Sequence, residues 1–214
     1  MLVDQVYGGE AARLLDYLGS AAKAMNRRLA IHAAGGLLVA AIAQSHAHAA
    51  SFDVPDLMRL IAATTEVRAS FTEEKHSSLL AAPIVSSGTL LYRRPDLVEK
   101  TIVSPRRERL RIVGQELTIE RDGSERRVAL ASQPLLLGLA AGLRGVLSGD
   151  AALLGTHFRL KLEGHEGAWR LDLQPVDEAL ASHVESIVVS GRAGRVEQIG
   201  IRETNGDRSL MQVR

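Results

Sequence analysis

Residues 158–173, FRLKLEGHEGAWRLDL, carry the clearest pattern in this chain of 214 residues. Apolar and charged side chains alternate on both sides of a turn at Gly164–Gly167. Because successive side chains of a strand point to opposite faces, the alternation predicts two strands with one apolar and one solvated face. Such strands are typical of antiparallel sheets, whereas the strands of a β-α-β array are apolar on both faces.

Similar short strands are predicted along most of the chain after residue 65. The candidates are Arg68–Leu79, Ile84–Arg93, Leu97–Val103, Glu108–Val113, Glu116–Glu120, Arg126–Leu130, His183–Ser190, Arg195–Glu203 and Arg208–Val213. Asp122-Gly123 and Asn205-Gly206 are typical hairpin turns. About nine to eleven strands joined largely by hairpins favour a sheet that curls into a barrel or half-barrel.

Two helical regions interrupt the strands. Asp53 is a candidate N-cap for a short helix that ends near Thr65, with Pro55 in its first turn. The second region is Gln133–Leu154, in which Asp150 is a candidate cap for a second short helix. Gly138, Gly142 and Gly145 inside this region weaken a helix by roughly 3 kcal/mol relative to alanine, so the helix depends on packing. Two interpretations stay open: a loosely held lid over the sheet, or a core helix whose glycines permit close packing.

The first 49 residues have the features of a leader. Arg27-Arg28 precedes the small, apolar run Leu29–Ala43, and Ala47-His48-Ala49 is a typical cleavage site. The run is shorter than the ~20 residues that span a bilayer. We therefore expect a signal peptide at 25–49, a periplasmic protein, and a single domain at 50–214. Residues 1–24 do not fit in front of a signal peptide, which indicates either that Met25 is the true start or that the leader has an extended basic region.

The composition excludes several classes of function. The formal net charge of +1 gives no overall electrostatic basis for binding nucleic acid or an anionic membrane. There is no cysteine, so thiolate metal sites and a cysteine nucleophile are excluded. The sequence has no His pair with metal-ligand spacing, no nucleophile elbow and no phosphate loop, so we expect no metal, no cofactor and no catalysis. A dispersed catalytic triad stays open as the least favoured alternative.

One family combines these features in the same order. The segments Ala69–Lys75, Ser87–Leu90, Tyr92–Leu97, Ser104-Pro105 and Ile112–Leu117 resemble the periplasmic outer-membrane lipoprotein carriers of the LolA-like family. The resemblance extends in order from Phe52 to about Leu210 and is densest at 69–117. It implies an unclosed antiparallel half-barrel, mainly β with a few helices, covered by a helical lid over a cavity for acyl chains.

The resemblance also implies roles for particular residues. In the family, the arginine before the proline of this segment bonds backbone groups of the lid, and here that residue is Arg94, which we expect to act as a latch. A solvated strand end is the equal alternative for Arg94 and the favoured one for Arg93. The chain departs from the family at Lys100, where members often have tryptophan, and this indicates a divergent relative.

The resemblance and the alternation together suggest which apolar side chains line the cavity. An apolar residue at such a position is more often part of the core than in contact with a ligand. The candidates are Leu91, Ile102, Leu110, Ile112, Leu160 and Leu171 for the lining, with Leu137 and Leu143 for the lid. The expected cargo is an acylated lipoprotein or lipid, passed by a monomer from an inner-membrane donor complex to an outer-membrane acceptor. A carrier serving a dedicated lipid exporter, and a half-barrel regulatory module that binds a protein partner, are the alternatives.

The leader assignment is tested by the N-terminus of the exported protein. Cleavage after Ala49 exposes Ala50 as the first residue, because small side chains at 47 and 49 fit the cleavage-site pattern. Intact-mass and N-terminal peptide mass spectrometry of protein from the periplasmic fraction should identify Ala50. A different first residue, or a chain that keeps residues 1–49, would show that the assignment is wrong.

Overall fold

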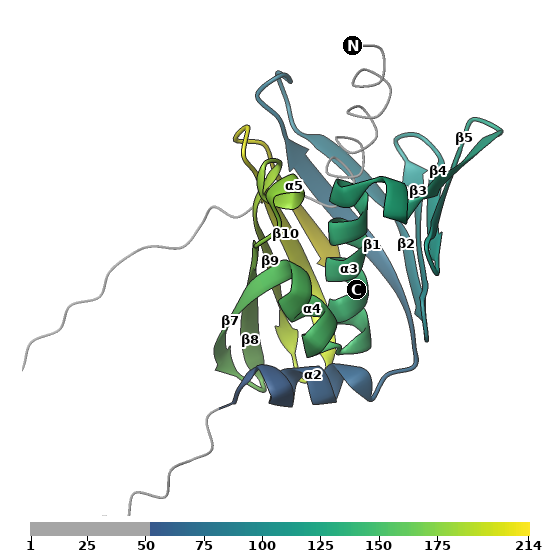
Figure 1. Cartoon of the computed structure of the whole chain (residues 1–214). Helices are drawn as coiled ribbons and strands as arrows, with labels where there is room; N and C mark the ends of the chain where they lie inside the picture. The colour runs from purple at the N-terminus through teal and green to yellow at the C-terminus, as the bar shows by residue number, and fades with distance from the viewer. Residues whose placement is uncertain (1–51) are drawn as a thin grey trace, which may run out of the picture.

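A single antiparallel sheet of eleven strands dominates the computed structural model, which describes residues 52–214 (Figure 1). The strands are β1 (Glu66–His76), β2 (Ile84–Arg93), β3 (Leu97–Ser104), β4 (Glu108–Val113), β5 (Glu116–Arg121), β6 (Ser124–Ala129), β7 (Phe158–His165), β8 (Ala168–Pro175), β9 (Val184–Arg192), β10 (Arg195–Glu203) and β11 (Arg208–Val213). Their bounds match the predicted strands to within a few residues. The predicted leader lies outside the described residues.

The order of the strands explains the shape of the sheet. The order is β6-β5-β4-β3-β2-β1-β11-β10-β9-β8-β7, so the first and last strands of the domain pair at its centre. Phe71 of β1 lies opposite Val213 of β11 at this junction. Within the described residues β6 and β7 are the two outer strands and do not pair with each other, so the barrel is unclosed. The predicted half-barrel is confirmed.

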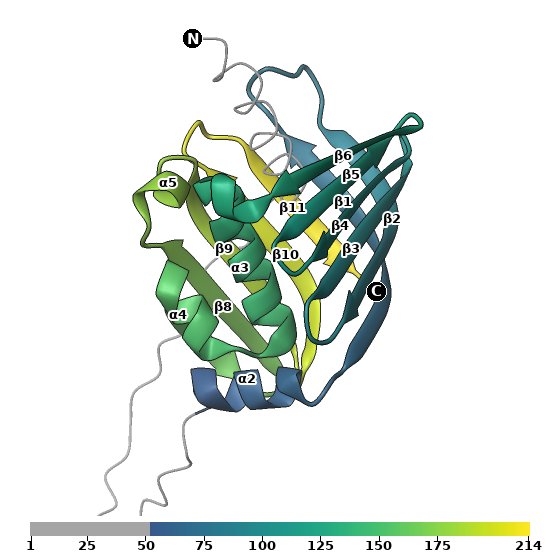
Figure 2. The ribbon, with the colours of Figure 1, turned by 45° about the vertical axis from the view of Figure 1, so that its right-hand side comes forward.

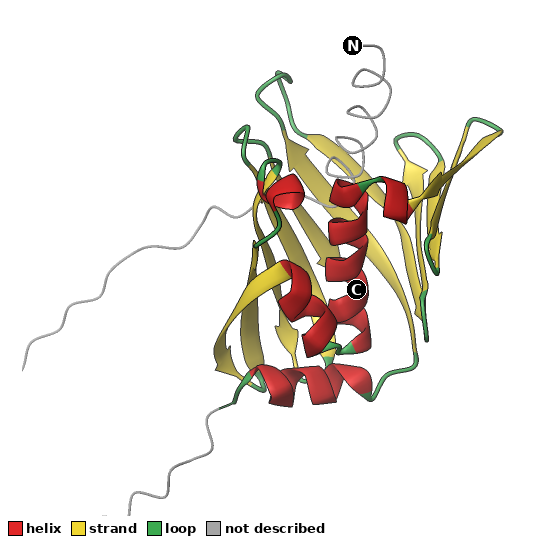
Figure 3. Cartoon of the chain, in the orientation of Figure 1, coloured by secondary structure: helices red, strands yellow, loops and turns green. Residues whose placement is uncertain are grey.

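The helices lie on the concave face of the sheet (Figures 2 and 3). They are α2 (Val54–Ala62), the 3-10 turn η1 (Leu130–Ser132), α3 (Pro134–Ser148), α4 (Ala151–His157) and α5 (Glu178–Ala181). Asp53 caps α2 by accepting a hydrogen bond from the backbone N–H of Asp56, and Asp150 caps α4 in the same way at Leu153. Both predicted caps are confirmed, whereas the sequence did not indicate α5.

Close packing explains the glycines of α3. A Cβ at Gly142 would lie 2.8 Å from Cζ of Phe158, and one at Gly145 would lie 2.6 Å from Cγ of Leu154. These distances are shorter than real Cβ contacts, so any larger residue would push α3 away from β7 and α4. The contacts favour the second interpretation of the glycines. Helix α3 covers the concave face of the sheet and is packed firmly against α4 and β7.

A left-handed residue joins α3 to α4 and lies against α2. Gly149 has φ +70° and ends α3, as glycine commonly does at this position. A Cβ here would overlap the carbonyl oxygen of Met58 and would lie 2.8 Å from the backbone nitrogen of Ala62. Gly149 therefore lets the end of α3 approach the backbone of α2.

Replacing this glycine tests the contact between α3 and α2. We expect Gly149→Ala to lower the free energy of unfolding by about 2–3 kcal/mol, because it adds backbone strain and an overlap with α2. Gly155→Ala in α4 is the matched control, since a Cβ there meets no atom within 4 Å. The control should raise the free energy of unfolding by about 0.5–1 kcal/mol through helix propensity. Urea denaturation measures both, and equal effects of the two changes would contradict the packing argument.

Candidate functional site

An apolar cavity of about 380 Å³ lies between α3 and the inner face of the sheet. Helix α3 contributes Leu139, Ala140, Gly142, Leu143, Val146 and Leu147 to its lining, and the strands contribute side chains that include Tyr92, Val98, Leu110, Ile112, Leu173, Val189, Ile199 and Ile201. The lining is largely aliphatic, and Tyr92 is its aromatic member. The volume lies within the range of about 300–1,000 Å³ that small-molecule sites usually have.

Four of the predicted positions border this cavity. They are Leu91, Leu110 and Ile112 on the strands and Leu143 on α3. Leu110 and Ile112 belong to the buried core as well, so they have contacts on both sides. Leu90 and Tyr92, the neighbours of Leu91 on β2, pack in or against the core cluster. Leu91 points to the opposite face of the strand and is not part of this cluster. It therefore contributes to the border of the cavity without belonging to the apolar core.

The other four predicted positions lie outside the lining. Ile102 and Leu171 are buried in the core, and Leu160 and Leu137 are partly buried against it. Helix α4 packs against β7, and α5 packs against β8 and β9, so helices fill this part of the concave face. Leu160 and Leu171, which were predicted to line the cavity, therefore pack in or against the core instead.

Helical geometry explains which α3 residues the sequence analysis missed. Leu139, Leu143, Val146 and Leu147 recur at the spacing of one helix face, and all four line the cavity. Leu137 lies six residues before Leu143, which places it about 240° around the helix and off this face. Extending the i, i+3, i+4 pattern from Leu143 would have identified the other three.

Arg94 connects the ends of two helices at one end of the molecule. Its Nη2 donates to the carbonyl oxygen of Ala62, the last residue of α2, at 2.9 Å and to that of Ser148, the last residue of α3, at 2.6 Å. The carbonyls at a helix C-terminus lack helical partners and carry partial negative charge, so a guanidinium stabilises them. Arg94 thereby holds α2, α3 and the end of β2 together.

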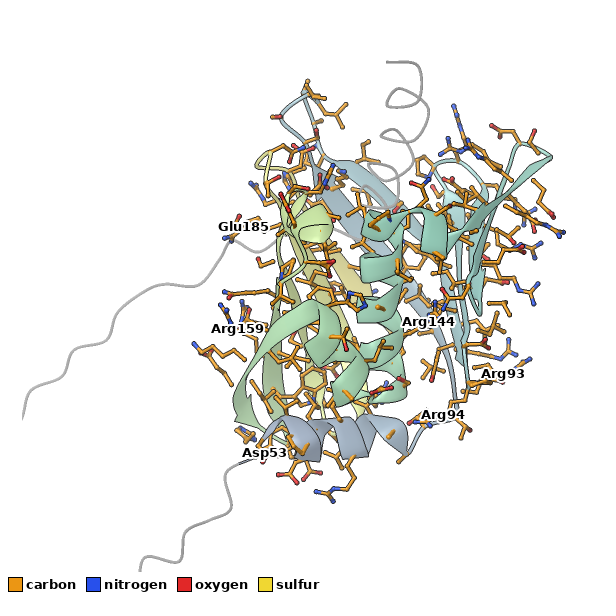
Figure 4. The ribbon with its side chains drawn as sticks, viewed as in Figure 1. Asp53, Arg93, Arg94, Arg144, Arg159 and Glu185 are labelled. Carbon is orange, nitrogen blue, oxygen red and sulfur yellow. The ribbon has the colours of Figure 1, made fainter. Side chains whose placement is uncertain are left out.

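Its neighbour Arg93 has a different environment. Figure 4 shows Arg94 beside the end of α2, whereas Arg93 points away from the helices. Nε of Arg93 donates to Oε2 of Glu66 at 2.7 Å, in an ion pair on the outside of the sheet. The solvated strand end predicted for Arg93 agrees with this position.

Tyr92 places a polar atom in the lining. Its side chain is 2% exposed, and its hydroxyl has no hydrogen-bond partner among the described residues. Burial raises the pKa of this hydroxyl, while the charge of Arg94 acts in the opposite direction. The electrostatic influence of Arg94 therefore reaches the wall of the cavity.

A buried ion pair supplies the only lysine of the lining. Nζ of Lys100 lies 2.7 Å from Oε2 of Glu73 and 4.7 Å from the ring centroid of Phe71. Burial raises the pKa of Glu73 against the effect of Lys100, and burial lowers the pKa of Lys100 against the effect of Glu73. A second buried pair, Lys75 with Glu203 at 3.3 Å, lies on the same face of the sheet. The concave face thus combines an apolar cavity with paired charges.

Metal-holding groups and membrane-spanning helices are two further kinds of feature that bear on function. Within residues 52–214, no three or more His, Cys, Asp or Glu side chains form a group able to hold a metal ion. In the same range, every helix is too short or too polar to cross a bilayer.

The sequence match agrees with the fold and the cavity. Residues 46–212 match the family model described as "Outer membrane lipoprotein carrier protein LolA-like". The chain belongs to the LolA-like family. No curated protein matches the sequence significantly.

Several solved structures resemble this LolA-like chain at low identity. A LolA superfamily protein from Nitrosomonas europaea is 10% identical, with a TM-score of 0.44 over 75% of this chain and 89% of that chain. MucB is 16% identical, with a TM-score of 0.41 over 77% of this chain and 58% of that one. The lipoprotein LppX from Mycobacterium tuberculosis is 8% identical, with a TM-score of 0.38 over 75% and 93% of the two chains.

The helix contacts of Arg94 lead to a stability prediction. Arg94→Gln should lower the free energy of unfolding by about 1–3 kcal/mol, because both carbonyls lose a charged donor. Hydrogen exchange at the last turns of α2 and α3 should become faster at the same time. Arg93→Gln is the matched control, and its exposed ion pair should leave stability and exchange close to the wild type. Equal exchange in the two variants would mean that Arg94 does not hold the helix ends.

Proposed function

We propose that this protein is a periplasmic carrier of acyl chains. It binds the chains of a lipoprotein or lipid in the cavity beneath α3 and passes them toward the outer membrane without catalysis. The apolar cavity of about 380 Å³ is the observation that carries this proposal. Membership of the LolA-like family supports it. An inner-membrane donor complex and an outer-membrane acceptor are the partners that such a route requires.

The aliphatic lining suits a cargo that must later be released. Burial of an acyl chain contributes ~0.8 kcal/mol per CH₂, or on the order of 10 kcal/mol for a long chain. Side chains such as Leu143, Val146 and Leu147 make contacts that depend on area and not on direction, so a chain can slide out as well as in. The cavity thus favours binding without fixing one chemical identity of the cargo.

In this proposal Arg94 is the latch. Its hydrogen bonds to Ala62 and Ser148 hold the helix ends beside the cavity. Each such bond to a charged group contributes about 1.5–3 kcal/mol, and less when it is exposed to solvent. An entering acyl chain contributes more than both bonds together, so cargo can displace the latch and the latch can reform after release.

Filling the cavity tests the binding step. Leu143→Trp adds volume to the lining and should weaken binding of a fluorescent acyl probe at least tenfold, because the side chain occupies the space of the tail. Leu137→Trp is the control, since Leu137 is also partly buried on α3 but lies outside the lining. Native mass spectrometry of wild-type protein purified from the periplasm should show co-purified lipid. Equal probe binding in both variants would contradict the assignment of the cavity.

The latch is tested by separating binding from transfer. Arg94→Leu should keep cargo but deliver it to acceptor vesicles or an acceptor protein at least tenfold more slowly, and Arg93→Leu should deliver normally. Normal delivery by Arg94→Leu would remove the latch while leaving the carrier intact. A stoichiometric protein partner without lipid in the native mass spectrum would instead support the regulatory module.

A further inference from the structure

An exposed apolar loop projects from the end of the sheet opposite to α2 and Arg94 (Figures 1 and 2). This β1–β2 loop and its flanks include Leu79, Leu80, Ile84 and Val85, of which Leu79 is 91% exposed. Val103, at the end of the neighbouring strand β3, is also exposed. Single exposed apolar residues are common, but a cluster at the tip of a projection indicates a contact surface.

The backbone of the loop is already hydrogen-bonded. The N–H of Ser78 donates to Oδ1 of Asp207 at 3.0 Å, which anchors the loop to the β10–β11 turn. The N–H groups of Leu79 and Leu80 donate to the hydroxyl and carbonyl oxygens of Ser77. Three consecutive amides at the tip therefore have partners without solvent. These three amides can leave water without becoming unsatisfied donors in a hydrocarbon environment.

Positive charge lies beside the apolar tip. Arg106 and Arg107 form the β3–β4 turn at the same end of the sheet, and both are exposed. Neither arginine forms an ion pair with another described residue. Three acidic groups at this end are already engaged: Glu108 is paired with Arg121, Glu74 is paired with His76, and Asp207 accepts the hydrogen bond of the loop. Asp122 lies one hairpin away, in the β5–β6 turn. The end of the molecule thus presents a projecting apolar tip with two available cations next to it.

We propose that the β1–β2 loop and the Arg106-Arg107 turn form a docking surface for a bilayer that contains anionic phospholipid. Leu79 and Leu80 enter the interface between headgroups and acyl chains, and the arginines lie among the phosphates. A projecting tip can enter a deformable lipid layer, whereas it would make little contact with a flat protein surface. This surface does not depend on what the cavity holds, so it can be present even if the protein carries no acyl chain.

The absence of cysteine allows a site-specific test. Leu79→Cys carries an NBD fluorophore in the otherwise full chain, and the probes are vesicles of phosphatidylcholine and phosphatidylglycerol at 3:1. We expect a blue shift and a severalfold rise in emission when these vesicles are added. The same dye at Val113→Cys is the control, because Val113 is also an exposed apolar residue, at 42%, but ends β4 at the other end of the sheet. An equal response of the dye at both positions would overturn the proposal.

Vesicle sedimentation separates the two parts of the surface. Leu79→Ser/Leu80→Ser should weaken binding tenfold or more, and Arg106→Gln/Arg107→Gln should weaken it up to about thirtyfold on anionic vesicles only. Arg59→Gln/Arg192→Gln removes the same charge at the far end and should bind as the wild type. All variants contain the same N-terminal segment, so differences in vesicle binding between them come from the substituted residues. Unchanged binding in both loop and turn variants, or crosslinking of residue 79 to a protein and not to lipid, would overturn the proposal.

Discussion

An unclosed sheet that curls cannot cover its own concave face, and this constraint organises the rest of the structure. The inner side chains of all eleven strands need a cover, and α3 supplies the main part of it. At the outer strands β7–β9 the short helices α4 and α5 add to the cover, and Leu160 and Leu171 pack there in or against the core. Beneath α3 a cavity separates the helix from side chains of both halves of the sheet, such as Leu110 on β4 and Val189 on β9. This space is the part of the concave face that the helical cover leaves unfilled.

Two kinds of contact hold this helical cover in place, and they differ in the free energy that is lost when the contacting groups separate. Gly142 and Gly145 let α3 pack directly on Phe158 and Leu154, and separating these surfaces would leave voids. The bonds of Arg94 to the ends of α2 and α3 are near solvent, so water can replace the lost partners. The bonds of Arg94 are consequently less costly to separate than the glycine contacts, although the close approach of Gly149 to α2 lies at the same end of α3.

Most of the fold could be predicted because its signals are local. Alternation located the strands, and Asp122-Gly123, Asp53 and Asp150 marked a hairpin and two helix starts from nearby residues alone. The pairing of β1 with β11 was not predicted, since it joins distant parts of the chain and no short pattern encodes it. Alternation also cannot distinguish a cavity from a core, because both use the same inner face. Leu110 and Leu171 look alike in the sequence, but only Leu110 borders the cavity.

Charges on the concave face were equally hidden in the sequence. Lys100 was noted there only as a departure from the family, whereas its partner Glu73 lies on another strand, 27 positions earlier. Burying an isolated charge costs free energy, whereas a buried pair with good geometry is tolerated. The burial of either residue is therefore explained only by the presence of the other. Such a pair can be recognised only once the register of β1, β2 and β3 is known.

The free outer edges of β6 and β7 have a mechanical consequence. In a closed barrel the number of strands and their stagger fix the circumference, so the interior cannot widen without breaking ladder bonds. Here, within the described chain, no ladder joins the two edges, and the gap between them can change by bending alone. The volume of the hollow can therefore change without the breaking of any ladder bond.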